Sequence, residues 1–143
     1  MIDITERAKF YWENGNNCAR SAACGILDYY DYPEISKYIR KALLPFGGGI
    51  GEGSVCGSAT GALAALSIIL SEKGFSDEEI SQKTKMFKEK FRKEFSAIDC
   101  RDILDEFRLE DGSIDKENPK RREKCTKTVI RAVLIVKELV DPL

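Results

Sequence analysis

Apolar residues recur every three or four positions along most of the chain, which is the spacing of one face of an α-helix. This spacing predicts helices over residues 3–13, 18–30, between Pro33 and Pro45, from Cys56 to about Leu70, over 76–98, briefly from Cys100, and over about 119–140. No stretch alternates apolar and polar residues for long enough to make a strand. We therefore predict an all-α, single-domain bundle of about six or seven helices over residues 1–143, with a Gly-rich loop before the central helix.

Residues with capping chemistry mark several of the expected helix starts. Asn17 is a candidate N-cap for the second helix, and Asp99 is one for the short helix that Cys100 opens. Ser76 and Glu79 have the spacing of a capping box. The third helix is expected to bury the stripe formed by Ile35, Tyr38, Ile39 and Leu43.

The glycines cluster around Cys56, within residues 43–70. This segment is not a phosphate-binding P-loop, because no Lys-Ser/Thr pair ends it, and no strand precedes it as a dinucleotide fingerprint requires. Gly57 and Gly61 lie four residues apart and share one helix face. Glycine costs stability inside a helix, so this pair indicates that another helix comes close to Cys56. Tight packing alone explains the pair equally well.

Composition excludes several classes of function. The chain has no histidine, which removes Ser-His-Asp and Cys-His catalysis and every histidine-containing metal site. The net charge of −1 gives no general bias toward nucleic acid or membrane. The N-terminal residues lack the apolar core of a signal peptide, and the apolar run 62–70 is too short to span a bilayer. We expect a cytoplasmic protein whose cysteines are kept reduced.

Four of the five cysteines fall near predicted helix starts. Cys18, Cys56 and Cys100 lie in a first turn, and Cys125 lies within the first two turns of the last helix. The helix N-terminus favours negative charge and lowers the pKa of a thiol, so Cys56 is expected to be reactive or metal-ligating. The alternative is that Cys56 only fills space, as buried cysteines often do. Cys24 points elsewhere on its helix and is interpreted as core.

Basic residues surround Cys125 near the start of the last helix. Nearby cations also lower the pKa of a thiol. The alternative is a solvated basic end to an amphipathic helix, which charge runs of this kind usually form. The residues are Lys120, Arg121, Arg122, Lys124 and Lys127.

The segment Cys56-Gly57-Ser58-Ala59-Thr60-Gly61 resembles the central motif of the C_GCAxxG_C_C family of redox-active proteins. The resemblance covers essentially the whole chain. It implies that Cys18 is the early family cysteine, Cys56 the motif cysteine, and Cys100 and Cys125 the later pair. Ser58 departs from the alanine of the motif and adds a hydroxyl that could donate to a nearby thiolate. The resemblance implies a redox role and supplies no substrate.

Three hypotheses follow. In the first, the protein is a thiol oxidoreductase with catalytic residues Cys56, Cys18, Cys100 and Cys125. Cys56 attacks, and one of the other three resolves the mixed disulfide. In the second, the same four cysteines hold zinc or an iron–sulfur cluster. In the third, the chain is a non-catalytic helical interaction module with buried, inert cysteines.

The thiol hypothesis requires no cofactor. Its partner would be another thiol/disulfide protein or a small redox molecule. We expect neither nucleic acid nor membrane as a partner. An exposed apolar face would allow a homodimer.

Overall fold

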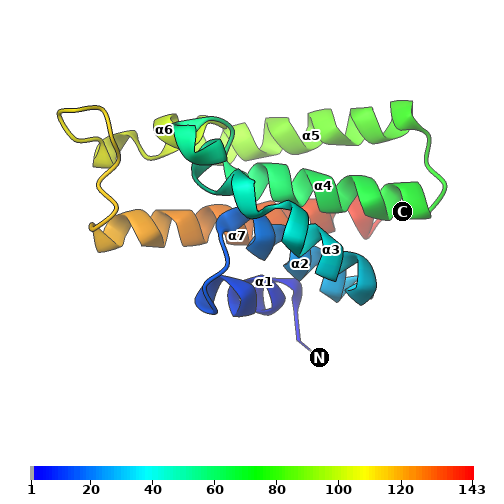
Figure 1. The fold of residues 1–143 in the computed structure, drawn as a ribbon. Coiled ribbons are helices and arrows are strands. Elements are labelled where there is room, and N and C mark those ends of the chain that lie inside the picture. The colour runs from blue at the N-terminus through cyan, green and yellow to red at the C-terminus, as the bar shows by residue number, and fades with distance from the viewer. Residues whose placement is uncertain (1) are drawn as a thin grey trace.

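A computed structural model of the chain describes residues 2–143 and shows an all-α domain (Figure 1). Six helices of ten residues or more are joined by one-turn helix α6 and three short helical turns, and no strand forms within residues 2–143. The elements are α1 (Ile4–Glu13), α2 (Cys18–Tyr29), α3 (Pro33–Ala42), η1 (Leu44–Phe46), η2 (Gly49–Gly53), α4 (Gly57–Glu72), α5 (Asp77–Phe95), α6 (Cys100–Ile103), η3 (Asp105–Phe107) and α7 (Pro119–Val140).

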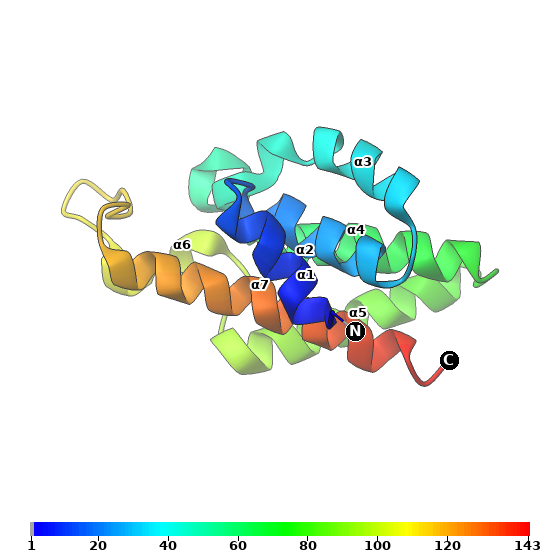
Figure 2. The ribbon, with the colours of Figure 1, turned by 90° about the horizontal axis from the view of Figure 1, so that it is seen from below.

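The helices α2 and α4 form the centre of the bundle. Helix α2 packs against α1, α3, α4 and α7, and every residue from Ser21 to Leu27 is buried. Helix α4 also packs against α5 and α7, which run beside it as the longest helices (Figure 1). Figure 2 shows α3 on one side of this core and residues 108–118 extending beyond the start of α7. The predicted bundle is therefore confirmed, with α2 as central as α4.

Capping side chains fix two of the three helix starts for which the sequence offers a cap. The side chain of Asn17 accepts a hydrogen bond of 2.8 Å from the Arg20 N–H. Ser76 and Glu79 form a reciprocal capping box at α5. Asp99 occupies the N-cap position of α6, but its side chain makes no capping hydrogen bond. Local sequence thus sets the starts of α2 and α5, whereas tertiary contacts must hold the four-residue helix α6.

Helices α2 and α4 approach one another more closely than side chains would allow. A Cβ atom on Gly61 would lie 2.2 Å from the carbonyl oxygen of Ala19, well inside van der Waals contact. Gly57 is similarly crowded by α2 and by the Phe46 carbonyl oxygen. The two glycines therefore provide the space that the sequence indicated, and the helix that fills it is the one that carries Cys18.

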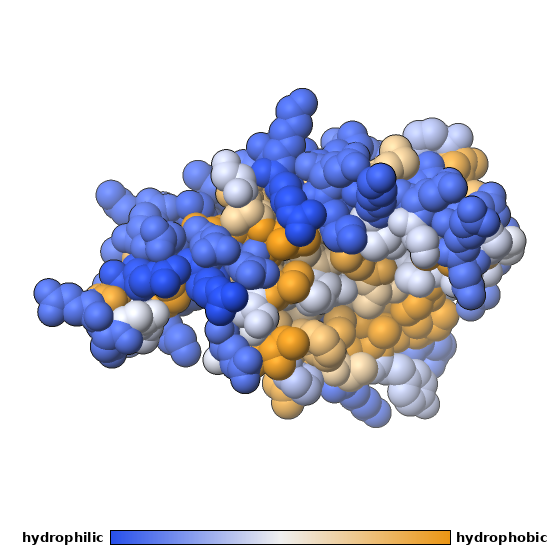
Figure 3. Space-filling model, turned by 90° about the horizontal axis from the view of Figure 1, so that it is seen from above, coloured by the Kyte–Doolittle hydropathy of each residue, from blue (hydrophilic) through white to orange (hydrophobic). Residues whose placement is uncertain are grey.

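The molecule keeps part of its apolar surface exposed. The expected stripe on α3 is wrong at Tyr38, which is 70% exposed; the only buried residue of α3 is Ser36. Outward-facing residues of α4, including Leu63 and Ile68, remain half-exposed. Figure 3 shows the resulting apolar area over α4, between α5 and α3. Within residues 2–143, no helix has both the length and the apolar character needed to cross a membrane.

The close contact of α2 and α4 predicts an unusual response to alanine. Replacing Gly61 with alanine should lower the free energy of unfolding by about 1–3 kcal/mol, because the new methyl group overlaps the Ala19 backbone. In a helix without such a contact, the same change would stabilise by about 0.5–1 kcal/mol. Urea denaturation measures the difference. Ser67→Ala, on the half-exposed face of α4, is the control and should change stability by less than about 0.5 kcal/mol. Stabilisation by Gly61→Ala would contradict the packing described here.

Candidate functional site

Four cysteines from four different helices line one cavity of about 1000 Å³. They are Cys18 of α2, Cys56 at the N-cap of α4, Cys100 of α6 and Cys125 of α7. These are the four cysteines that the sequence proposed as site residues. Cys24 does not line the cavity: it is fully buried, and its thiol donates to the Ser36 carbonyl oxygen over 3.5 Å.

Cys18 reaches the cavity because α2 begins at this residue, directly beside α4. Its Sγ atom lies 2.5 Å from the position that a Cβ on Gly57 would occupy. Any side chain at residue 57 would therefore displace the Cys18 thiol. The glycine that follows Cys56 along the chain is the residue that leaves room for Cys18. Cys18 is partly exposed, whereas Cys56 is only 5% exposed.

A short backbone bridge holds Cys56 next to Cys100. The N–H of Cys56 donates to the Ile98 carbonyl oxygen over 2.8 Å, and the N–H of Cys100 donates to the Ser54 carbonyl oxygen over 2.7 Å. This antiparallel bridge pairs Val55 with Asp99. It joins segments more than forty positions apart in the sequence and places each cysteine at the start of its helix. The sequence contains no strand pattern that could have predicted it.

A buried pair of hydroxyl groups connects Cys56 to the helix of Cys125. Ser58 and Thr128 lie 2.9 Å apart, and Thr128 donates to the Cys125 carbonyl oxygen over 2.7 Å. The sequence suggested that the Ser58 hydroxyl donates to a nearby thiolate. In the structure it pairs with the Thr128 hydroxyl instead. Thr128 was not predicted as a site residue, although its position three residues after Cys125 places it near the same helix face.

The glycine-rich segment forms a wall of the cavity. It forms a tight turn, η2, in which Ile50 and Gly51 have non-helical backbone angles. Glycines 48, 49 and 51 have φ values between 62° and 69°, a left-handed conformation that suits glycine. Ile50 adopts the same conformation with φ of 59°. The cavity wall thus follows from a run of backbone conformations that few other residues adopt.

Burial raises the pKa of three of the four thiols. The pKa of Cys56 rises to about 11, because removal from water opposes ionisation and the nearby Cys18 adds negative charge. The backbone N–H groups at the start of α4 and the Thr128 hydroxyl act in the opposite direction but do not prevail. The pKa of Cys100 rises to about 12 for the same main reason, with Cys56 the next cause. The expected lowering of the Cys56 pKa by the helix N-terminus is therefore wrong.

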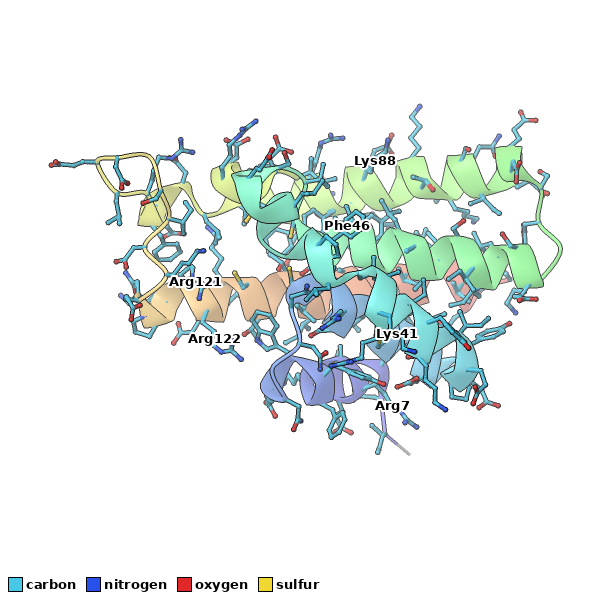
Figure 4. All side chains as sticks on the ribbon, in the orientation of Figure 1. Arg7, Lys41, Phe46, Lys88, Arg121 and Arg122 are labelled. Atoms are coloured by element: carbon cyan, nitrogen blue, oxygen red, sulfur yellow. The ribbon has the colours of Figure 1, made fainter. Side chains whose placement is uncertain are left out.

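Cys125 has the cation that the sequence placed near it. Arg121 Nη1 lies 3.7 Å from the Cys125 Sγ atom and favours the thiolate. Burial still raises the pKa of Cys125, so one arginine only partly offsets the loss of water. Figure 4 shows Arg121 on the side of α7 that faces α6, whereas Arg122 lies toward α1. The Arg122 guanidinium stacks 4.4 Å from the centre of the Trp12 ring.

The four thiols offer a chemically suitable donor set for zinc or an iron–sulfur cluster. Their positions, however, do not match one: within residues 2–143, no three cysteine, aspartate or glutamate side chains converge as metal ligands do. A metal would require the side chains around the cavity to move.

The raised pKa of Cys56 predicts how alkylation depends on pH. Only the thiolate reacts, so the rate at Cys56 should increase about tenfold per pH unit between about pH 7.5 and 10. Iodoacetamide labelling followed by peptide mass spectrometry measures this slope. Buried Cys24 is the internal control, since its labelling would reveal global opening. A Cys56 rate that levels off near pH 7 would instead indicate a thiolate stabilised by the helix N-terminus.

One of three comparisons with known proteins finds a match, and that match includes the cavity cysteines. No curated protein and no solved structure matches the chain significantly. A family model described as "Putative redox-active protein (C_GCAxxG_C_C)" matches residues 16–139. The match contains all four cavity cysteines and the glycines at which α2 meets α4. The chain therefore belongs to this C_GCAxxG_C_C family.

Proposed function

We propose that the protein transfers electrons by thiol/disulfide exchange in the cavity lined by Cys18, Cys56, Cys100 and Cys125. The observation that carries the proposal is the convergence of four cysteines, from four separate helices, on one cavity, while the fifth lies apart in the core. No disulfide joins any two of the five cysteines, all of which lie within residues 2–143. The partner is another thiol/disulfide protein or a small disulfide.

The first pair to exchange electrons in this proposal is Cys18 and Cys56. Their thiols are near enough for the charge on Cys18 to raise the pKa of Cys56, and Gly57 keeps the space between them free. Cys18 is the better attacking thiol because it is partly exposed and lies at the start of a twelve-residue helix. Cys56 is buried and protonated at neutral pH, which suits the resolving role. This reverses the order that the sequence favoured.

The exchange proceeds in two balanced steps. The Cys18 thiolate attacks one sulfur of a disulfide RSSR, which forms a Cys18–S–S–R bond and releases RS⁻. Cys56 then loses its proton to the released RS⁻ and attacks the Cys18 sulfur, which releases the second RS⁻. This second leaving thiolate takes its proton from solvent. Two electrons move from the protein dithiol to RSSR, giving a Cys18–Cys56 disulfide and two RSH, and excess RSH reverses the reaction.

One preparation tests the proposal against its alternatives. Protein purified without oxygen should be colourless and metal-free, and mild oxidation should create an intramolecular disulfide within the cavity. Visible absorption or a stoichiometric metal would support the zinc or iron–sulfur alternative instead. Thiols that alkylate only after denaturation, and that form no disulfide, would support an inert interaction module. Metal analysis, absorption spectra and disulfide mapping by mass spectrometry distinguish these three outcomes.

Serine variants separate the attacking thiol from the resolving one. With a small disulfide in excess, Cys56→Ser should accumulate a stable mixed disulfide on Cys18, because no resolving thiol displaces it. Cys18→Ser should react at least about tenfold more slowly, because the remaining cavity thiols are held protonated by burial. Intact-mass spectrometry over time measures both effects. Cys24→Ser is the matched control and should behave like the unmodified protein. Accumulation in Cys18→Ser, with the adduct on Cys56, would restore the opposite order.

A further inference from the structure

The cavity carries positive charge that the whole chain does not. Five cationic side chains line it against two carboxylates, although the net charge of the protein is −1. The cations come from α6, the segment after η3 and the start of α7, so they gather at one end of the cavity. They are Arg101, Arg108, Lys116, Arg121 and Arg122, and the carboxylates are Glu13 and Glu52.

Two of these cations already have carboxylate partners outside the cavity lining. Arg101 lies 3.6 Å from Asp99, and Arg108 lies 3.0 Å from Asp105. The other three form no ion pair with any carboxylate of residues 2–143. Positive charge therefore remains available for a ligand, and it lies beside the thiols.

Arg121 is the cation most directly tied to the thiols. Its Nη1 points to the Cys125 sulfur, and its Nη2 donates to the Lys116 carbonyl oxygen over 3.4 Å. Its Nε is buried and has no hydrogen-bond partner within residues 2–143. A partly buried guanidinium without a carboxylate partner can still bind an anion. Arg121 thus lies beside Cys125, one of the four thiols that line the cavity.

We propose that the cavity selects a small disulfide that carries carboxylates, such as a short acidic peptide disulfide. This inference rests on the proposed thiol/disulfide exchange and adds the class of substrate. The cavity volume of about 1000 Å³ suits a molecule of this size. Lys116, Arg121 and Arg122 bind its carboxylates and hold the S–S bond at the thiols. The reaction is the balanced exchange given above, with RSSR the anionic disulfide and RSH its thiol.

Three disulfides of different charge test the inference. They are oxidised glutathione, which is anionic, bis(2-hydroxyethyl) disulfide, which is neutral, and cystamine, which is cationic. Each rate constant with the reduced protein is divided by that with free 2-mercaptoethanol, a thiol with no other charged group, which corrects for intrinsic reactivity. The corrected preference for oxidised glutathione over cystamine should be about tenfold or more at low salt. It should fall as ionic strength rises, because salt screens the cations.

Charge variants connect the preference to particular residues. Lys116→Glu should reduce the corrected preference several-fold, because it replaces a cation at the cavity with a carboxylate. The side chain is exposed and has no ion pair to lose, so the fold should be unaffected. Arg121→Gln alone should reduce the corrected preference by a larger factor than Lys116→Glu, because Arg121 is the cation that contacts a cavity thiol. Lys88→Glu is the control with the same charge change as Lys116→Glu; Lys88 lies on α5, outside the cavity lining, and should leave the preference unchanged (Figure 4).

The outcomes separate this inference from the proposed function. If all three disulfides react in proportion to their intrinsic reactivity, the anionic substrate class is wrong but thiol exchange stands. The substrate class is equally wrong if Lys88→Glu changes the preference as much as Lys116→Glu does. If none of the three oxidises the cavity thiols, the proposed function itself fails. A preference seen only with an acidic protein disulfide would overturn the assignment to a small molecule.

Discussion

The arrangement of the site depends on how closely α2 and α4 can approach. Side chains normally keep helix backbones well apart, but Gly61 removes that barrier opposite Ala19, and Gly57 removes it opposite Cys18. With any larger residue at these positions, α2 would move outward and carry Cys18 away from Cys56. The two glycines lower the intrinsic stability of α4, and its packing in the core must compensate. The position of the first thiol pair is therefore decided by backbone contact rather than by the cysteines themselves.

The same packing that gathers the thiols also makes them hard to ionise. Removal from water raises the pKa of Cys56 more than the backbone N–H groups at the start of α4 lower it, and it is also the largest cause of the raised pKa of Cys100. A disulfide carries no charge, so its burial has no comparable cost. A buried pair of cysteines is thus a poor nucleophile but an acceptable place to store a disulfide. This asymmetry favours a division of labour in which an accessible thiol attacks and a buried one resolves.

The sequence predicts local features well because their causes are local. Helical periodicity, the Asn17 cap and the capping box at Ser76 all act within a few residues, and each is present. The Gly57–Gly61 pair indicated a close contact, although not which helix makes it. The bridge between Val55 and Asp99 could not be predicted, because one residue pair leaves no periodic pattern. The helix-end argument misjudged Cys56 because desolvation depends on the neighbours that the fold supplies.

The net charge of the chain does not reveal where its charged side chains gather in the fold. A net charge of −1 argues against a general attraction to polyanions, yet it conceals a local excess of cations at one cavity. The basic residues near Cys125 were interpreted either as thiol activation or as a solvated helix end. The structure combines elements of both: Arg122 stacks on Trp12, whereas Arg121 contacts the thiol without overcoming its burial. A single guanidinium that cannot ionise a buried thiol can still orient an anion beside it. For these cysteines, the surrounding cations therefore matter more for where a disulfide is held than for how readily a thiol loses its proton.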